Sequence, residues 1–223
     1  MSGYRNTLGK MSLVYRLCRG VLLAMGKLRY GLTVCGAERV PEGGPLIVAI
    51  NHFQYVDTFL VFMVVPRRLW VMVKKEALIG LLWRALSSVI FPVDRQKIDY
   101  TAMRTALGIL SRGGVIAVAP EGTRRKDSEA VATPKGGVAM LATRSGAPIL
   151  PVYLSKAPGL LGRIRGERLR VSVGEPLRVR DNLRHSRDYQ AFSGKVVEAI
   201  YTLERQADRR SIKAKRRNRR TLA

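Results

Sequence analysis

Short apolar runs recur along the middle of the chain, and stretches with helical spacing lie between them. The runs predicted as strands are 45–50, 68–74, 89–93, 115–120, 147–154 and 167–177. The helices predicted among them are 57–65, 76–87, 98–112, 134–145 and 188–208. This alternation is typical of an α/β fold with a largely parallel central sheet flanked by helices. A length of 223 residues suits one such domain.

The sequences of three predicted strands indicate whether each strand lies in the centre or at an edge of the sheet. "VIAVAP" at 115–120 is apolar without interruption, which favours burial on both faces. Pro92 in "VIFPV" has no N–H to donate and favours an edge or an irregular strand end. The Arg/Val alternation at 167–177 favours a half-exposed edge strand.

The N-terminal segment predicts one amphipathic helix over 8–32. Arg16, Arg19 and Lys27 lie opposite an apolar stripe whose members recur every three or four residues. The stripe consists of Leu8, Met11, Val14, Cys18, Val21, Met25, Leu28 and Leu32. Such a helix can lie in a membrane interface, or it can pack its stripe on the domain that follows, and both alternatives stay open.

The charge balance indicates an anionic partner. Lys and Arg number 40 against 16 Asp and Glu, a formal net charge of +24. Nucleic acid, anionic lipid and phosphorylated substrates all fit such a surplus. Aromatic residues make up only 7% of the chain and do not alternate with the basic residues, which disfavours nucleic acid.

Three regions follow from these patterns. Residues 1–36 form a membrane-associating segment, 37–204 the α/β domain, and 205–223 a basic tail that is disordered or loosely helical. No uninterrupted apolar run reaches 18 residues, and no signal peptide is recognisable. We therefore expect a peripheral or monotopic protein at the cytoplasmic face of the membrane.

Polar residues follow several of the predicted strands. His52 comes directly after the strand 45–50, and Asp57 begins the next helix in "NHFQYVD". A carboxylate that holds one imidazole nitrogen leaves the other free as a general base. The competing interpretation is that Asn51 or Asp57 simply caps the helix and His52 is incidental.

Other strand ends add cations and a carboxylate. Lys74 and Arg95 each end or follow a strand, and "APEGTRR" at 119–125 contributes Glu121, Gly122 and Arg124. Arg presents a planar fork that suits phosphate, and Gly allows backbone to approach a ligand. Because ligands bind at the carboxyl ends of strands in open α/β sheets, these residues can form one anion pocket.

The order of these motifs resembles the lysophosphatidic acid acyltransferase family. The matching pieces are "NHFQYVD", which has the pattern N-H-x-x-x-x-D, then "FPVDR", "APEGTRR" and "APILPVYL". The resemblance runs from about residue 40 to 177. Two positions depart from the family pattern, Val89 where a Gly is usual and Ala119 where Phe is common.

The resemblance implies acyl transfer to the sn-2 hydroxyl of 1-acylglycerol-3-phosphate, which gives phosphatidic acid. His52 would act as the base with Asp57 orienting it, and the donor would be acyl-CoA or acyl carrier protein. The residues implied in phosphate and glycerol binding are Lys74, Arg95, Glu121, Gly122, Thr123 and Arg124. No metal, other cofactor or nucleic acid is expected. The acceptor could instead be glycerol-3-phosphate or another lysophospholipid.

Overall fold

The structure is a computed structural model that describes residues 13–51, 57–74, 90–93, 100–121, 134–179 and 183–221. Its strands are β1 (Thr33–Cys35), β2 (Leu46–Ile50), β3 (Leu69–Lys74), β4 (Ile90–Val93), β5 (Val115–Val118), β6 (Ile149–Leu154) and β7 (Arg170–Val173). Its helices are α1 (Leu13–Tyr30), the 3-10 turn η1 (Ala37–Arg39), α2 (Asp57–Val64), α4 (Tyr100–Leu110), α5 (Gly137–Ser145), α6 (Leu160–Ile164) and α7 (Ser186–Thr221). The helix predicted at 76–87 lies outside the described residues.

All seven of these strands form one sheet in the order β1-β7-β6-β2-β5-β3-β4. The five strands from β6 to β4 run parallel to one another. β7 is antiparallel to β6, and β1 runs parallel to β7. The prediction of an α/β fold with a largely parallel central sheet is therefore confirmed.

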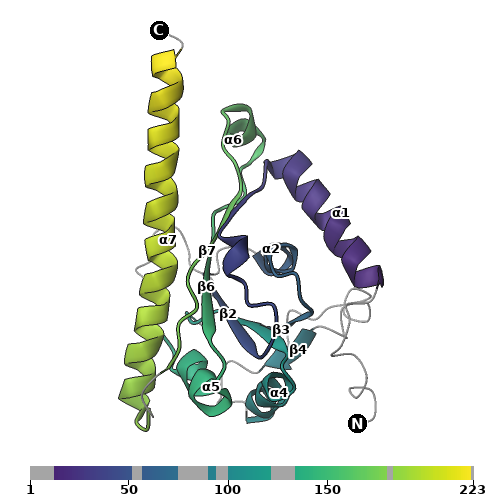
Figure 1. Ribbon diagram of the computed structural model, residues 1–223, viewed down its shortest axis with the longest axis vertical. Coiled ribbons are helices and arrows are strands. Elements are labelled where there is room, and N and C mark those ends of the chain that lie inside the picture. Colours follow the sequence, from purple (N-terminus) through teal and green to yellow (C-terminus); the bar gives the residue numbers. More distant parts are fainter. Residues whose placement is uncertain are drawn as a thin grey trace.

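Two apolar layers cover the faces of this sheet. In β2, Val48 and Ile50 point toward a cluster that includes α2 and part of α1, whereas Ile47 and Ala49 point toward α4, α5 and α7. Figure 1 shows α1 and α2 on one side of the sheet and α4, α5 and α7 on the other. Every residue of β2 is buried because both faces are covered, which is why the strand is apolar throughout.

The sequence predicted an edge position for two strands, 89–93 and 167–177, and the structure agrees with only the first of these predictions. β4 is an edge strand, as Pro92 indicated. β7 is not an edge strand, and the prediction for 167–177 was wrong. The short strand β1 pairs outside β7, and Val171 to Val173 are buried. Strand β1 has only three residues, too few for its alternation to be read in the sequence.

Helix α1 packs on the domain, but not through the predicted stripe, so that alternative was wrong for the stripe residues whose burial the structure describes within the helix. Leu22, Leu23 and Tyr30 pack against the core, whereas Val21, Met25 and Leu28 on the other side are exposed. Leu32, predicted as part of the stripe, is buried in the core beyond the helix end. Exposed Leu17 joins the stripe instead. Across the described residues, no helix is long and apolar enough to span a membrane.

Helix α7 continues past the predicted end near residue 208 and reaches Thr221. No Gly or Pro interrupts 195–221, and Arg, Lys, Gln and Ala in this stretch favour helix. The basic tail therefore continues the helix that packs on the sheet, and Figure 1 shows it extending well beyond the sheet, past the level of α6. Helix propensity outweighed the repulsion between like charges on which the prediction of a disordered or loosely helical tail depended.

Candidate active site at the carboxyl edge of the sheet

The parallel strands bring their carboxyl ends to one edge of the sheet. Asn51 follows β2, Glu121 follows β5 by three residues, and Lys74 is the last residue of β3. Asp57 is the first residue of α2, so it returns to the same edge from the loop after β2. This is where ligands bind in open α/β sheets. His52, Arg95, Gly122, Thr123 and Arg124 lie outside the described residues, as do the side chains of Asp57 and Lys74.

Asn51 is completely buried and joins two of these strand ends. Its amide nitrogen donates to the carbonyl oxygen of Leu154 at 2.8 Å, and its Oδ1 accepts from the Leu154 N–H at 2.7 Å. Leu154 is the last residue of β6, which neighbours β2. Asn51 therefore joins the end of β2 to the end of β6, immediately before His52 in the chain.

Glu121 is the predicted site residue whose side chain the structure describes. It is 3% exposed, and its Oε1 accepts a hydrogen bond of 2.6 Å from the hydroxyl of Tyr201. Tyr201 lies on α7, eighty positions further along the chain, and is 7% exposed. The contact fixes the carboxylate that begins the Glu-Gly-Thr-Arg motif against the last helix. The sequence offered no signal for this partner, since a buried Tyr in an amphipathic helix looks like an ordinary core residue.

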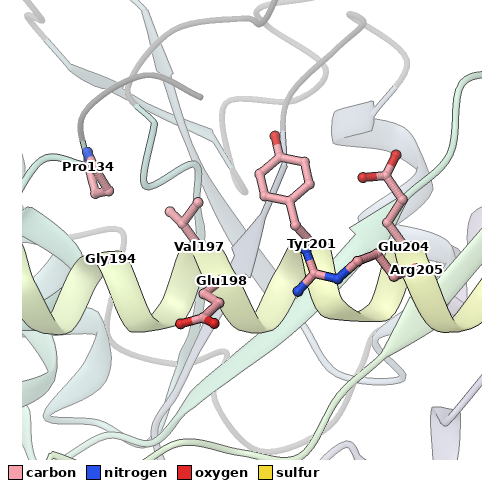
Figure 2. Close-up of a pocket in the computed structure, with 7 residues that line it drawn as sticks. All are labelled: Pro134, Gly194, Val197, Glu198, Tyr201, Glu204 and Arg205. Carbon is pink, nitrogen blue, oxygen red and sulfur yellow. The ribbon is translucent and has the colours of Figure 1, made fainter. Parts of the chain in front are cut away.

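A cavity of about 470 Å³ adjoins this pair on the α7 side. Its lining combines apolar and charged groups: Pro134, Gly194, Val197, Glu198, Tyr201, Glu204 and Arg205. Figure 2 shows Tyr201 and Glu204 rising from one side of α7, with Glu198 on the opposite side. Tyr201 therefore contributes both to this cavity and to the hydrogen bond with Glu121.

The amino edge of the sheet is occupied differently. The guanidinium of Arg67 donates to the carbonyl oxygens of Pro41 at 3.1 Å, Gly113 at 2.9 Å, and Gly44. These carbonyls belong to the loops that precede β2 and β5. Burial lowers the pKa of Arg67 from its ordinary value, but a guanidinium remains protonated in proteins. The guanidinium of Arg67 holds these two loops together through hydrogen bonds. Its role therefore differs from the phosphate binding predicted for the cations at the carboxyl edge.

The fold is that of an open, mostly parallel α/β protein, a class that generally binds ligands at the carboxyl edge of its sheet. The chain belongs to the acyltransferase family, whose model matches residues 31–155. The matched stretch contains the N-H-x-x-x-x-D and Glu-Gly-Thr-Arg segments together with strands β1 to β6.

Individual relatives agree with this membership. A 1-acyl-sn-glycerol-3-phosphate acyltransferase of Bacillus subtilis is 26% identical over 173 residues, 75% of this chain and 84% of that protein. One from Streptococcus pneumoniae is 23% identical over 173 residues, and the match spans 64% of its length. The crystal structure of the 1-acyl-sn-glycerophosphate acyltransferase of Thermotoga maritima has a TM-score of 0.64 at 22% identity. That comparison covers 86% of this chain and 81% of the other, and it shows the same fold.

Proposed function

We propose that this protein is a 1-acylglycerol-3-phosphate acyltransferase that produces phosphatidic acid. The observation that carries the proposal is the acyltransferase match over 31–155, because it contains both the His52 and the Glu121 motifs. The relatives from Bacillus subtilis and Streptococcus pneumoniae bear the name of this activity. The donor would be acyl-CoA or acyl carrier protein.

In the proposed reaction His52 takes the proton of the acceptor's sn-2 hydroxyl, while Asp57 orients the imidazole and stabilises its protonated form. The hydroxyl oxygen then attacks the thioester carbonyl carbon of the donor. The new C–O bond forms, the C–S bond breaks, and the departing thiolate recovers the proton from the imidazolium. The position of Asn51 supports this assignment, since its two hydrogen bonds fix the backbone that presents His52.

The acceptor phosphate would be bound by Arg95 and Arg124, with Lys74 as a further cation, because guanidinium groups bind phosphate in bidentate fashion. Glu121 would accept a hydrogen bond from a glycerol hydroxyl, and Gly122 and Thr123 would supply backbone close to the ligand. Support for this arrangement comes from topology: β3, β4 and β5 are adjacent parallel strands, so the segments after them share one edge.

A lysophospholipid acceptor resides in a membrane, so we propose that the protein works at an anionic bilayer surface on its cytoplasmic face. Helix α1 supports this through four exposed apolar side chains, Leu17, Val21, Met25 and Leu28, which are between 58% and 81% exposed. Arg16, Lys27 and Arg29 on the same helix are also exposed. Apolar area and basic residues together are what peripheral attachment requires.

The test is an acyl-transfer assay of the purified protein in detergent solution, with 1-acylglycerol-3-phosphate, glycerol-3-phosphate and a zwitterionic lysophospholipid as competing acceptors. Each acceptor is offered with acyl-CoA and, separately, with acyl carrier protein. We expect 1-acylglycerol-3-phosphate to give the highest kcat/KM. A higher kcat/KM for either of the other acceptors would identify that acceptor as the substrate instead. If none of the three acceptors is acylated, the proposal is wrong.

A further inference from the structure

The connection between β6 and β7 carries a short helix, α6, that presents aliphatic side chains to solvent. Leu160, Leu161 and Ile164 are 67%, 70% and 75% exposed. Their spacing of one and four residues places all three on one side of the helical turn. Single exposed aliphatic residues are ordinary, but three gathered on one turn form a patch that indicates an interaction surface.

The chain that holds this patch is firmly anchored. The Ser155 N–H donates to the Arg170 carbonyl at 2.9 Å, and the Arg170 N–H donates to the Ser155 hydroxyl at 2.8 Å, which closes the base of the connection. Pro158, two residues before α6, is buried. The outward direction of Leu160, Leu161 and Ile164 is therefore set by the fold, since the chain before them is held by buried Pro158 and by the hydrogen bonds of Ser155.

The same connection is tied to the end of α1. The Leu169 N–H donates to the Tyr30 carbonyl at 3.0 Å, and the Thr33 N–H donates to the Leu169 carbonyl at 2.9 Å. The Arg163 guanidinium of α6 lies so close to Gly31 that a Cβ there would be 3.0 Å from it. Figure 1 accordingly shows α6 beside the C-terminal end of α1. Both elements leave the core at the carboxyl edge, where β6 ends.

Charge decides what kind of partner this surface fits. Arg165 and Arg168 are exposed and Arg163 is half-buried, whereas Glu167 is the one acidic residue between 156 and 170. A patch of Leu and Ile bordered by arginines complements a bilayer that has anionic head groups above an apolar interior. A protein partner of ordinary composition would give no reason for such one-sided charge.

We propose that α6 is a second membrane contact, which inserts Leu160, Leu161 and Ile164 into an anionic phospholipid bilayer while Arg165 and Arg168 bind lipid phosphates. This inference rests on the proposed function, because an acceptor lipid would reach the carboxyl edge from that bilayer. Helix α1 and α6 would then attach the protein at two joined sites, and the strand end held by Asn51 would face the membrane between them.

The test measures co-sedimentation of the full chain with vesicles of phosphatidylcholine containing one third phosphatidylglycerol. The variant Leu160→Ser/Leu161→Ser/Ile164→Ser removes the patch without touching the core. We expect its partition coefficient to fall at least about tenfold, because full burial of even one aliphatic side chain contributes about that factor or more. Ala191→Ser, at an exposed position on α7, should leave binding unchanged.

A charge-matched pair tests the arginines. Arg165→Gln/Arg168→Gln should weaken vesicle binding several-fold more than Arg112→Gln/Arg144→Gln, which removes the same charge from exposed residues at the amino edge. Binding equal to the unmodified protein in the α6 triple variant would overturn the proposal. The proposal would also be overturned if the α6 triple variant kept its vesicle affinity but lost self-association or oligonucleotide binding. Because none of these readouts uses acyl transfer, a failure of the proposed activity is distinguishable from a failure of this inference.

Discussion

Two tyrosines that are each 7% exposed link the sheet region to α7, and they differ in what they hold. Tyr201 binds Glu121 of the Glu-Gly-Thr-Arg segment, whereas Tyr153 of β6 donates to Glu204 of α7 at 2.8 Å. Both hydrogen bonds join α7 to another part of the chain. The proposed mechanism gives a role to Glu121 but none to Glu204. Removing each tyrosine hydroxyl in turn therefore distinguishes an effect on the site from a general effect on packing.

We expect Tyr201→Phe to raise the KM for the phosphorylated acceptor about 3- to 10-fold, because Glu121 loses the hydroxyl that holds its carboxylate. The KM for the acyl donor should stay constant. Tyr153→Phe is the control, with a similar loss of stability, about 0.5–1.5 kcal/mol, and an unchanged acceptor KM. Equal kinetic effects of the two variants would show that Tyr201 serves packing alone.

His52→Ala should lower kcat by about 10² to 10⁴, the usual contribution of a general base. Circular dichroism and the thermal midpoint should remain those of the unmodified protein. Steady-state rates with saturating acyl-CoA give the comparison, and His185→Ala, at the exposed start of α7, is the matched control. Turnover that survives in purified His52→Ala would remove His52 from the mechanism.

Arg124→Ala should mainly raise the KM for the phosphorylated acceptor, because the lost guanidinium binds the acceptor's phosphate in the proposed complex. The ratio of KM values for 1-acylglycerol-3-phosphate in the variant and the unmodified protein measures the effect. A constant KM with a collapsed kcat would contradict phosphate binding and assign Arg124 to the chemical step.

The short element β1 depends on the glycine that follows it. Gly36 has a φ of 80°, and a Cβ at this position would collide with the Val173 carbonyl oxygen of β7. The close approach lets β1 pair outside β7, which in turn makes β7 an interior strand. The Arg39 guanidinium adds a hydrogen bond of 2.8 Å to the same carbonyl.

Gly36→Ala should destabilise the protein by about 1–3 kcal/mol from backbone strain, with a further cost from the collision. Gly108→Ala is the matched control in α4, where a Cβ meets nothing within 4 Å. That substitution should stabilise by about 0.5–1 kcal/mol through helix propensity. Urea unfolding of both variants measures the difference, and a neutral Gly36→Ala would refute the role assigned to the close approach.

The molecule as a whole carries a formal charge of +24, and in the part of the chain that the structure describes the exposed apolar patches lie on α1 and α6. Membrane binding should therefore have a salt-sensitive and a salt-resistant part. Raising salt from 0.1 to 1 M shortens the screening length from about 10 to 3 Å. We expect the affinity for anionic vesicles to fall at least about tenfold and to approach the affinity for neutral phosphatidylcholine vesicles. Sedimentation across a salt series measures this, and salt-independent binding would contradict it.

The sequence by itself was sufficient to predict the α/β class, the largely parallel sheet and, β1 excepted, where its strands lie along the chain. Period and apolar content are local properties, and β2 and β5 show them directly because both of their faces are buried. The motifs that follow the strands also predicted the family. His52, Arg95 and Arg124 remain sequence predictions, since they lie outside the described residues.

Only the tertiary structure decided which segments meet. The pairing of β1 with β7, the Tyr201 hydroxyl on Glu121, and the two Asn51 hydrogen bonds to Leu154 join residues that are 80 to more than 130 positions apart. The division of α1 into a packed and an exposed side, and the exposure of α6, likewise depend on what lies beside each helix. Hydrophobic pattern records that a side chain is apolar, but burial is set by neighbours that the chain brings near only when it folds.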